Sequence, residues 1–149
     1  MSEVTDLLTQ AYNDELETVM NYLANSIVLD GVRAEEIKQS LSQDVQEELG
    51  HAEMLGQRLR QLDETAPGSK QFTAGQDSLQ PPADTTDVVG VIEGVIDAEE
   101  DAIETYRSLV RAAREADDPV TEDLAVTILA DEEAHRTEFR GFRKEYRSE

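Results

Sequence analysis

The chain has 149 residues, and its 34 acidic residues outnumber the 13 basic ones to give a formal net charge of −21. This balance argues against direct nucleic-acid binding, which needs a basic footprint, and against docking on anionic lipid. The absence of cysteine excludes disulfides, thiolate metal ligands and catalysis by a thiol.

These properties set expectations for the whole chain. At this length we expect a single domain over residues 1–149 with a substantial buried core. The start of the chain lacks the pattern of a signal peptide, and no stretch has the length of a membrane span, so we expect a soluble, cytoplasmic protein. An acidic, lysine-poor surface favours a halophilic protein, in which salt screens self-repulsion; the alternative is that acidic patches gather cations.

Four segments carry apolar residues at spacings of three and four, which is the pattern of amphipathic helices. They cover about residues 4–29, 32–62, 88–113 and 119–146. Asp30-Gly31 separates the first two segments, and residues 116–118 separate the last two. Short breaks between long helices predict two antiparallel helical hairpins.

The stretch 64–87 is polar and contains Pro67, Pro81 and Pro82, so it is expected to be a long connection. Fully extended, a connection of this length reaches about 80 Å, whereas a helix of the predicted length spans about 42 Å. The connection can therefore cross from one end of the molecule to the other. The predicted fold is all-α: a four-helix bundle of two antiparallel hairpins joined by a long crossover.

The two histidines share a spacing pattern with four glutamates. His51 and His135 each follow a glutamate by three residues, Glu48 and Glu132 respectively. Glu15 and Glu99 each lie 33 residues before those glutamates, so the two residue sets are related by a constant offset of 84. The 33-residue spacing centres Glu15 and Glu48 on the first hairpin turn and Glu99 and Glu132 on the second, so all six residues are expected at one level of the bundle.

Each glutamate of this pattern lies on the apolar stripe of its helix. Glu15, for example, is seven residues from both Leu8 and Tyr22. Buried carboxylates without partners are costly, and the only stripe residues able to carry positive charge are His51 and His135. Metal is the best explanation, and imidazole with carboxylate suits iron, manganese or zinc. Four carboxylates and two neutral imidazoles balance the charge of two Fe(II) ions.

At residues 15–22 (ELETVMNY), 48–51 (ELGH) and 131–135 (DEEAH) the chain resembles the ferritin-like di-iron carboxylate proteins, closest to bacterioferritins and Dps-like mini-ferritins. The resemblance implies a ferritin-like bundle in which Glu48 and Glu132 bridge two metal ions. Glu15 with His51 would bind one ion, and Glu99 with His135 the other. It also implies that Tyr22 lies near the site as an electron donor, with Tyr106 as its pseudo-symmetric partner. Glu47 and Asp131 are candidates for orienting the histidines.

Departures from the family refine these expectations. Bacterioferritins bind haem through a methionine at the position of Leu49, so no haem is expected here. Only 14 residues follow His135, which favours a dodecameric shell or a dimer over a 24-subunit cage. The first helix has no histidine, so the site is expected within one subunit. Rubrerythrins often have a glutamate at the position of Ala102, which weakens a peroxidase interpretation.

The resemblance thus implies a ferroxidase for iron storage and detoxification, which oxidises Fe(II) with dioxygen or peroxide and limits oxidative stress. Two alternatives remain open: a rubrerythrin-like peroxide reductase, and a metal-stabilised bundle without turnover. Fe(II), the oxidant and further copies of the chain are the expected partners.

Other residues receive more ordinary interpretations. Met20 and Met54 are expected to fill the core, and Gly90 and Gly94 to permit close helix packing. Phe72 and Leu79 are expected to anchor the crossover. Five further glutamates are expected to be solvated, a few of them lining an iron access route: Glu17, Glu53, Glu100, Glu104 and Glu133.

Overall fold

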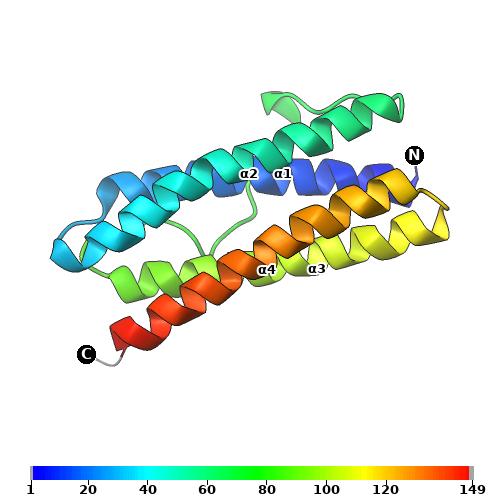
Figure 1. The fold of residues 1–149 in the computed structure, drawn as a ribbon. Helices are drawn as coiled ribbons and strands as arrows, with labels where there is room; N and C mark the ends of the chain where they lie inside the picture. The colour runs from blue at the N-terminus through cyan, green and yellow to red at the C-terminus, as the bar shows by residue number, and fades with distance from the viewer. Residues whose placement is uncertain (1, 148–149) are drawn as a thin grey trace.

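The computed structural model describes residues 2–147 and contains four long helices. They are α1 (Glu3–Val28), α2 (Glu35–Gln61), α3 (Val88–Glu115) and α4 (Pro119–Arg147). Two single 3₁₀ turns, η1 (Val32–Ala34) and η2 (Ser69–Gln71), lie in the connections, and no strand occurs between residues 2 and 147. The prediction of an all-α four-helix bundle is confirmed (Figure 1).

Side-chain caps fix where the helices begin. Ser2 and Thr5 form a reciprocal capping box at α1, with Thr5 N donating to Ser2 Oγ over 3.2 Å. Asp87 accepts from Gly90 N at the start of α3, over 3.0 Å. Asp118 accepts from Thr121 N at 3.1 Å, so Pro119 opens α4 with its missing N–H at a position that needs none.

The first hairpin turn differs slightly from the prediction. Gly31 adopts a φ of 101°, and the 3₁₀ turn η1 follows before α2 begins at Glu35. The predicted helix from residue 32 therefore starts three residues later. Asp30 N donates to Thr85 O at 2.9 Å, which ties this turn to the end of the crossover.

The two hairpins pair to make the bundle. α1 packs along α2 and α3 along α4, while the hairpins meet mainly through α1 and α3, leaving α2 and α4 further apart (Figure 1). The core divides into two clusters. One contains Tyr22, Leu41, Ile92 and Phe139; the other contains Leu8, Leu55, Leu59, Leu109 and Ile128. Each buried aliphatic side chain contributes about 1.5–3 kcal/mol of transfer free energy.

The crossover runs from one end of the bundle to the other and is held by polar contacts along α1 (Figure 1). Glu17 accepts backbone hydrogen bonds from Gly75 and Gln76, the latter over 2.7 Å. Glu17 is only 5% exposed, so its expected solvation is wrong: the crossover, rather than the helical bundle, covers it. Glu53, Glu100 and Glu104 are exposed as expected, and Glu133 is half-buried.

Apolar and glycine contacts complete the attachment of the crossover. Leu79 is 1% exposed and anchors the segment, whereas Phe72 is half-buried. Gly94 does permit a close approach, but to the crossover and not to a helix as expected, since a Cβ there would lie 2.2 Å from the carbonyl oxygen of Ser78. A Cβ at Gly90 would meet the side chain of Asp87, which caps α3, so this glycine does not serve close packing between helices either.

Met20 and Met54 lie outside the core, contrary to expectation. Met20 is 59% exposed and Met54 is 37% exposed. Each is two residues from a buried stripe residue, Tyr22 and Ala52 respectively, and two residues correspond to about 200° around a helix. Among residues 2–147, none of the helices combines the length and apolar character that a membrane span requires.

Candidate metal centre

Six side chains from all four helices converge at the middle of the bundle, between the two core clusters. They are Glu15, Glu48, His51, Glu99, Glu132 and His135. All are buried, with exposed fractions between 0 and 7%. They form two groups, in each of which one potential ligand atom per residue lies within 4.8 Å of the others.

The two groups overlap in a symmetric way. Glu48 and Glu132 belong to both groups, Glu15 and His51 complete the first, and Glu99 and His135 complete the second. The i,i+3 spacing on α2 and on α4 puts each glutamate and its histidine on one helix face. The structure thus brings together every residue that the sequence pattern selected as a ligand.

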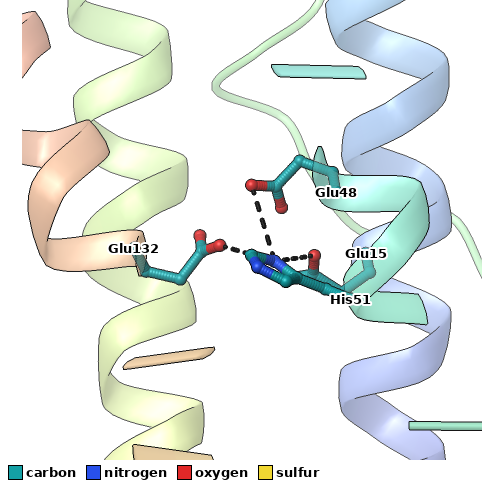
Figure 2. A group of neighbouring side chains, drawn as sticks. All are labelled: Glu15, Glu48, His51 and Glu132. Atoms are coloured by element: carbon teal, nitrogen blue, oxygen red, sulfur yellow. Dashed lines mark hydrogen bonds and ion pairs between the residues drawn. The ribbon is translucent and has the colours of Figure 1, made fainter. Parts of the chain in front are cut away.

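The Nδ1 atom of each histidine faces the carboxylates. His51 Nδ1 lies 3.2 Å from Glu15 Oε2, 3.1 Å from Glu132 Oε1 and 3.8 Å from Glu48 Oε1. Figure 2 shows the ring of His51 from α2 between Glu15 of α1 and Glu132 of α4. His135 Nδ1 lies 3.2 Å from Glu48 Oε1 and 3.8 Å from Glu99 Oε1.

The Nε2 atom of each histidine faces an acid of the opposite hairpin. His51 Nε2 is 2.9 Å from Asp131 Oδ2 on α4, and His135 Nε2 is 2.9 Å from Glu47 Oε2 on α2. An N–H donated from Nε2 to a carboxylate leaves the Nδ1 lone pair free to bind metal. The arrangement therefore suits both rings to coordination through Nδ1.

Two tyrosines donate hydrogen bonds to the outer glutamates. Tyr22 OH donates to Glu99 Oε1 over 2.5 Å, and Tyr106 OH donates to Glu15 Oε1 over 3.1 Å. Each tyrosine comes from the hairpin opposite to its glutamate. Burial raises the pKa of both phenols well above the usual 10, so both remain protonated donors.

Protons balance the charge of the metal-free cluster. Burial and the neighbouring Glu48 carboxylate raise the pKa of Glu15 well above its usual range, and burial with the Glu15 carboxylate does the same for Glu132. Burial lowers the pKa of His51, but hydrogen bonds to Glu15 and Glu48 outweigh it and raise the value to about 11. Burial also lowers the pKa of His135, but the Glu48 and Glu99 carboxylates outweigh it and raise the value to about 12.

Several buried oxygen and nitrogen atoms of the cluster lack hydrogen-bond partners. Within residues 2–147, no hydrogen bond of good geometry reaches either oxygen of Glu48, Glu99 Oε2, Glu132 Oε1 or His135 Nδ1, and the contacts of Glu48 Oε1 and Glu132 Oε1 with the imidazole nitrogens are ion pairs. An unsatisfied buried polar atom costs about 1–3 kcal/mol, so a cluster of them is unfavourable without a further ligand. All these atoms belong to the six converging residues. Their number and chemistry fit divalent iron, manganese or zinc.

Sequence reasoning missed one residue beside the cluster, Asp44 of α2. It is 7% exposed, and its Oδ1 lies 3.6 Å from His135 Nε2. Burial raises its pKa to about 7 despite the nearby histidine. The available signal was its position four residues before Glu48 and seven before His51, which places it on the same face of α2.

Comparison with known proteins gives one family. The family model for the ferritin-like domain matches residues 5–148. No match was found among curated proteins.

Solved structures share the fold over almost the whole chain. A Desulfovibrio desulfuricans bacterioferritin, reported with a diiron site, is 23% identical with a TM-score of 0.84, covering 98% of this chain and 81% of that one. A dodecameric thioferritin from Bacteroides fragilis, described as bacterioferritin-related, is 22% identical with a TM-score of 0.88, covering 97% and 86%. A ferritin-like diiron-carboxylate protein from Bacillus anthracis is 20% identical with a TM-score of 0.80, covering 96% and 99%.

Proposed function

Because this chain belongs to the family of ferritin-like domains, we propose that it is a ferroxidase that acts in iron storage and detoxification. Fe(II) is its substrate, dioxygen or hydrogen peroxide its oxidant, and Fe(III) its product. One observation carries the proposal. Two overlapping groups of buried carboxylates and imidazole share Glu48 and Glu132, and several of their potential ligand atoms have no hydrogen-bond partner.

The proposed ligand roles follow from this overlap. Glu48 and Glu132 bridge two ions, Glu15 and His51 complete one ligand set, and Glu99 and His135 complete the other. Bridging carboxylates offset the repulsion between ions about 3.5–4 Å apart. The same ligand chemistry accepts manganese or zinc, so iron is supported by the family rather than by the ligand atoms alone.

The other residues around the cluster support this chemistry. Asp131 and Glu47 hold the imidazoles with Nδ1 inward, because each accepts at Nε2 within 2.9 Å. Tyr22 donates a hydrogen bond to Glu99 Oε1, and its proposed electron donation would add one electron to the two from Fe(II) only where the oxidant accepts more than two electrons. Each Fe(II) gives up one electron, so two Fe(II) reduce dioxygen to peroxide, or peroxide to two waters, with uptake of two protons. Bound iron supplies the redox chemistry, and the chain supplies position and charge.

We also propose that the chain assembles into a homo-oligomer, with a dodecameric shell favoured over a dimer. A shell supplies the enclosed volume that storage of Fe(III) requires. The similarity to the dodecameric protein of Bacteroides fragilis supports this arrangement.

Anaerobic Fe(II) titration followed by admission of oxygen tests the proposal. We expect two tightly bound Fe(II) per chain and oxidation of both when oxygen is admitted. Glu48→Gln should lose both, because it removes charge shared by the two ions, while Glu53→Gln on an exposed position of α2 should behave as the wild type. Binding of one ion or none contradicts the proposal. Oxidation without uptake of excess iron favours the peroxide reductase instead.

A further inference from the structure

We infer that the two ion positions of the centre are unequal, because the crossover covers one of them and leaves the other beside a polar pocket. The position next to the pocket is the one that Glu15 and His51 hold, and the covered position is the one that Glu99 and His135 hold. The inference rests on the proposed ligand roles and goes beyond them, since the six ligands by themselves are related by an approximate two-fold arrangement.

The pocket lies between α1 and α3 and has a volume of about 290 Å³. It reaches the side chain of Glu15, and its lining also includes Asp14 of α1 with Asp101 and Ala102 of α3. Glu99, the counterpart of Glu15 in the second hairpin, is not part of this lining. Acidic walls raise the local concentration of cations, so the pocket suits the passage of a divalent ion to and from the Glu15 position.

The crossover closes the other half of the same α1–α3 face, where the end of α1 lies beside the start of α3 (Figure 1). Gln76 Nε2 donates to Thr18 Oγ1 over 2.9 Å, and Gln76 Oε1 accepts from Asn21 Nδ2 at 2.8 Å. On α3 the backbone of Ser78 lies so close to Gly94 that no side chain fits between them. The two α1 residues follow the α1 ligand, and Gly94 precedes the α3 ligand. The segment therefore lies over the Glu99 position.

Residues related by the offset of 84 show how the crossover breaks the two-fold arrangement. Thr18 and Asn21 are 8% and 5% exposed beneath the crossover, whereas their equivalents on α3, Ala102 and Thr105, are half-buried and line the pocket. One crossover serves two equivalent faces, so it covers only one of them. The opposite side of the bundle adds no such difference, because the acids at the two imidazoles have side chains that are 43% and 41% exposed.

This difference in cover predicts a difference in exchange rate. An ion at the Glu15 position exchanges through the pocket without movement of the backbone. An ion at the Glu99 position must wait for the crossover or the helices to open. We expect its exchange to be at least about tenfold slower, because the hydrogen bonds that hold the crossover at Gln76 must break first.

Displacement of Co(II) by Zn(II) in the whole protein tests the inference, because bound Co(II) absorbs visible light and Zn(II) does not. The metal-free wild type is loaded with Co(II) and mixed with excess Zn(II) in the absence of oxygen. Salt at about 0.15 M screens weak binding by the acidic surface. We expect two Co(II) per chain, lost in a fast phase and a slow phase that each account for one ion.

Two variants assign the phases. Ala102→Leu narrows the pocket and should slow the fast phase severalfold without changing the slow one. Gln76→Ala removes the side-chain hydrogen bonds that hold the crossover and should speed the slow phase severalfold. Ala130→Leu on α4 and Gln39→Ala on α2 make the same changes at exposed positions and should keep both wild-type rates.

Loss of both ions in a single phase overturns the inference alone, because two bound Co(II) still agree with the proposed ligand roles. A fast phase unchanged by Ala102→Leu, or a slow phase unchanged by Gln76→Ala, also overturns it, since the pocket or the crossover then does not control exchange. A wild type that binds fewer than two Co(II) refutes the proposed ligand roles, and this inference with them.

Discussion

The two nitrogens of each histidine have separate tasks, and this division is the central feature at the scale of single residues. Nδ1 of His51 faces Glu15 and Glu132, while Nε2 faces Asp131 across the hairpin interface. Replacing this anionic acceptor by a neutral amide removes the negative charge that supports the ring and makes the imidazole a weaker ligand. Acids of this kind typically change metal affinity by about 10–100-fold.

We therefore expect Asp131→Asn to weaken binding of the first Fe(II) by about 10–100-fold. Anaerobic competition with a coloured chelator measures the affinity. Asp123→Asn, at an exposed position on the same helix, is the matched control and should leave the affinity unchanged. Equal affinities for the two variants would show that the Nε2 contact does not orient the ring.

Metal binding should also release protons, because the metal-free cluster carries them on its imidazoles. The pKa of His51 rises to about 11 and that of His135 to about 12 in the folded protein. The stability that these protons give the metal-free protein is fully present below an unfolded pKa of about 6.5 and is lost as pH rises through the folded values. Between pH 7 and 9 both rings are therefore protonated until metal displaces the protons.

We expect at least two protons to be released per chain on loading at pH 7, and affinity to fall as pH is lowered. A pH indicator in weakly buffered solution measures the release, and Glu48→Gln, which should not bind the pair, supplies the blank. Full loading without proton release would contradict this account of the cluster.

At the scale of the elements, the helices and their pairing could be predicted, whereas the path of the crossover could not. Periodic apolar residues marked the four helices, and the glutamate spacings placed their faces at one level. The segment 64–87 has no such period, so its contacts depend on tertiary structure alone. Glu17 illustrates the limit: it is two residues from Glu15, off the stripe, and is buried only because the crossover covers it.

Glu17 should accordingly hold the crossover against α1 through its hydrogen bonds to Gly75 N and Gln76 N. We expect Glu17→Ala to destabilise the protein by about 2 kcal/mol, because hydrogen bonds to a charged acceptor contribute about 1.5–3 kcal/mol and the freed N–H groups of Gly75 and Gln76 can regain water. Urea denaturation measures the change. Glu53→Ala is the control at an exposed position. A loss of unfolding free energy no greater than in this control would show that Glu17 does not hold the crossover.

Gly94 tests the same attachment from α3. Alanine there places a Cβ 2.2 Å from Ser78 O, so the crossover must move, and we expect a loss of about 1–3 kcal/mol. Gly141→Ala on α4 meets open space and should instead stabilise the helix by up to about 1 kcal/mol. Thermal unfolding of both variants gives the comparison, and opposite signs are the predicted result.

At the scale of the whole molecule, the repeat of residue sets at an offset of 84 becomes an approximate two-fold arrangement of the hairpins. Each hairpin supplies two glutamates and one histidine, and each supplies the acid and the tyrosine that contact the other's ligands. The six-residue set could be chosen from spacing and apolar faces. Asp44 has no counterpart in the repeat, because Ile128 stands 84 residues later, and its position on the face of Glu48 and His51 was the only available signal.

Only four of the 34 acidic side chains belong to this middle layer, and the other acids that produce the net charge of −21 lie elsewhere in the chain. Four carboxylates are concentrated in the core, where only cations or protons can offset them. In the metal-free protein, protons on the glutamates and imidazoles offset this charge, and bound ions are expected to replace them, which makes the position of those ions the central claim.

Anomalous diffraction at the iron edge, from crystals loaded anaerobically with Fe(II), tests that claim most directly. We predict two strong peaks per chain about 3.5–4 Å apart, both within bonding distance of Glu48 and Glu132. A single peak in the layer, or peaks confined to surface acids, would contradict the account.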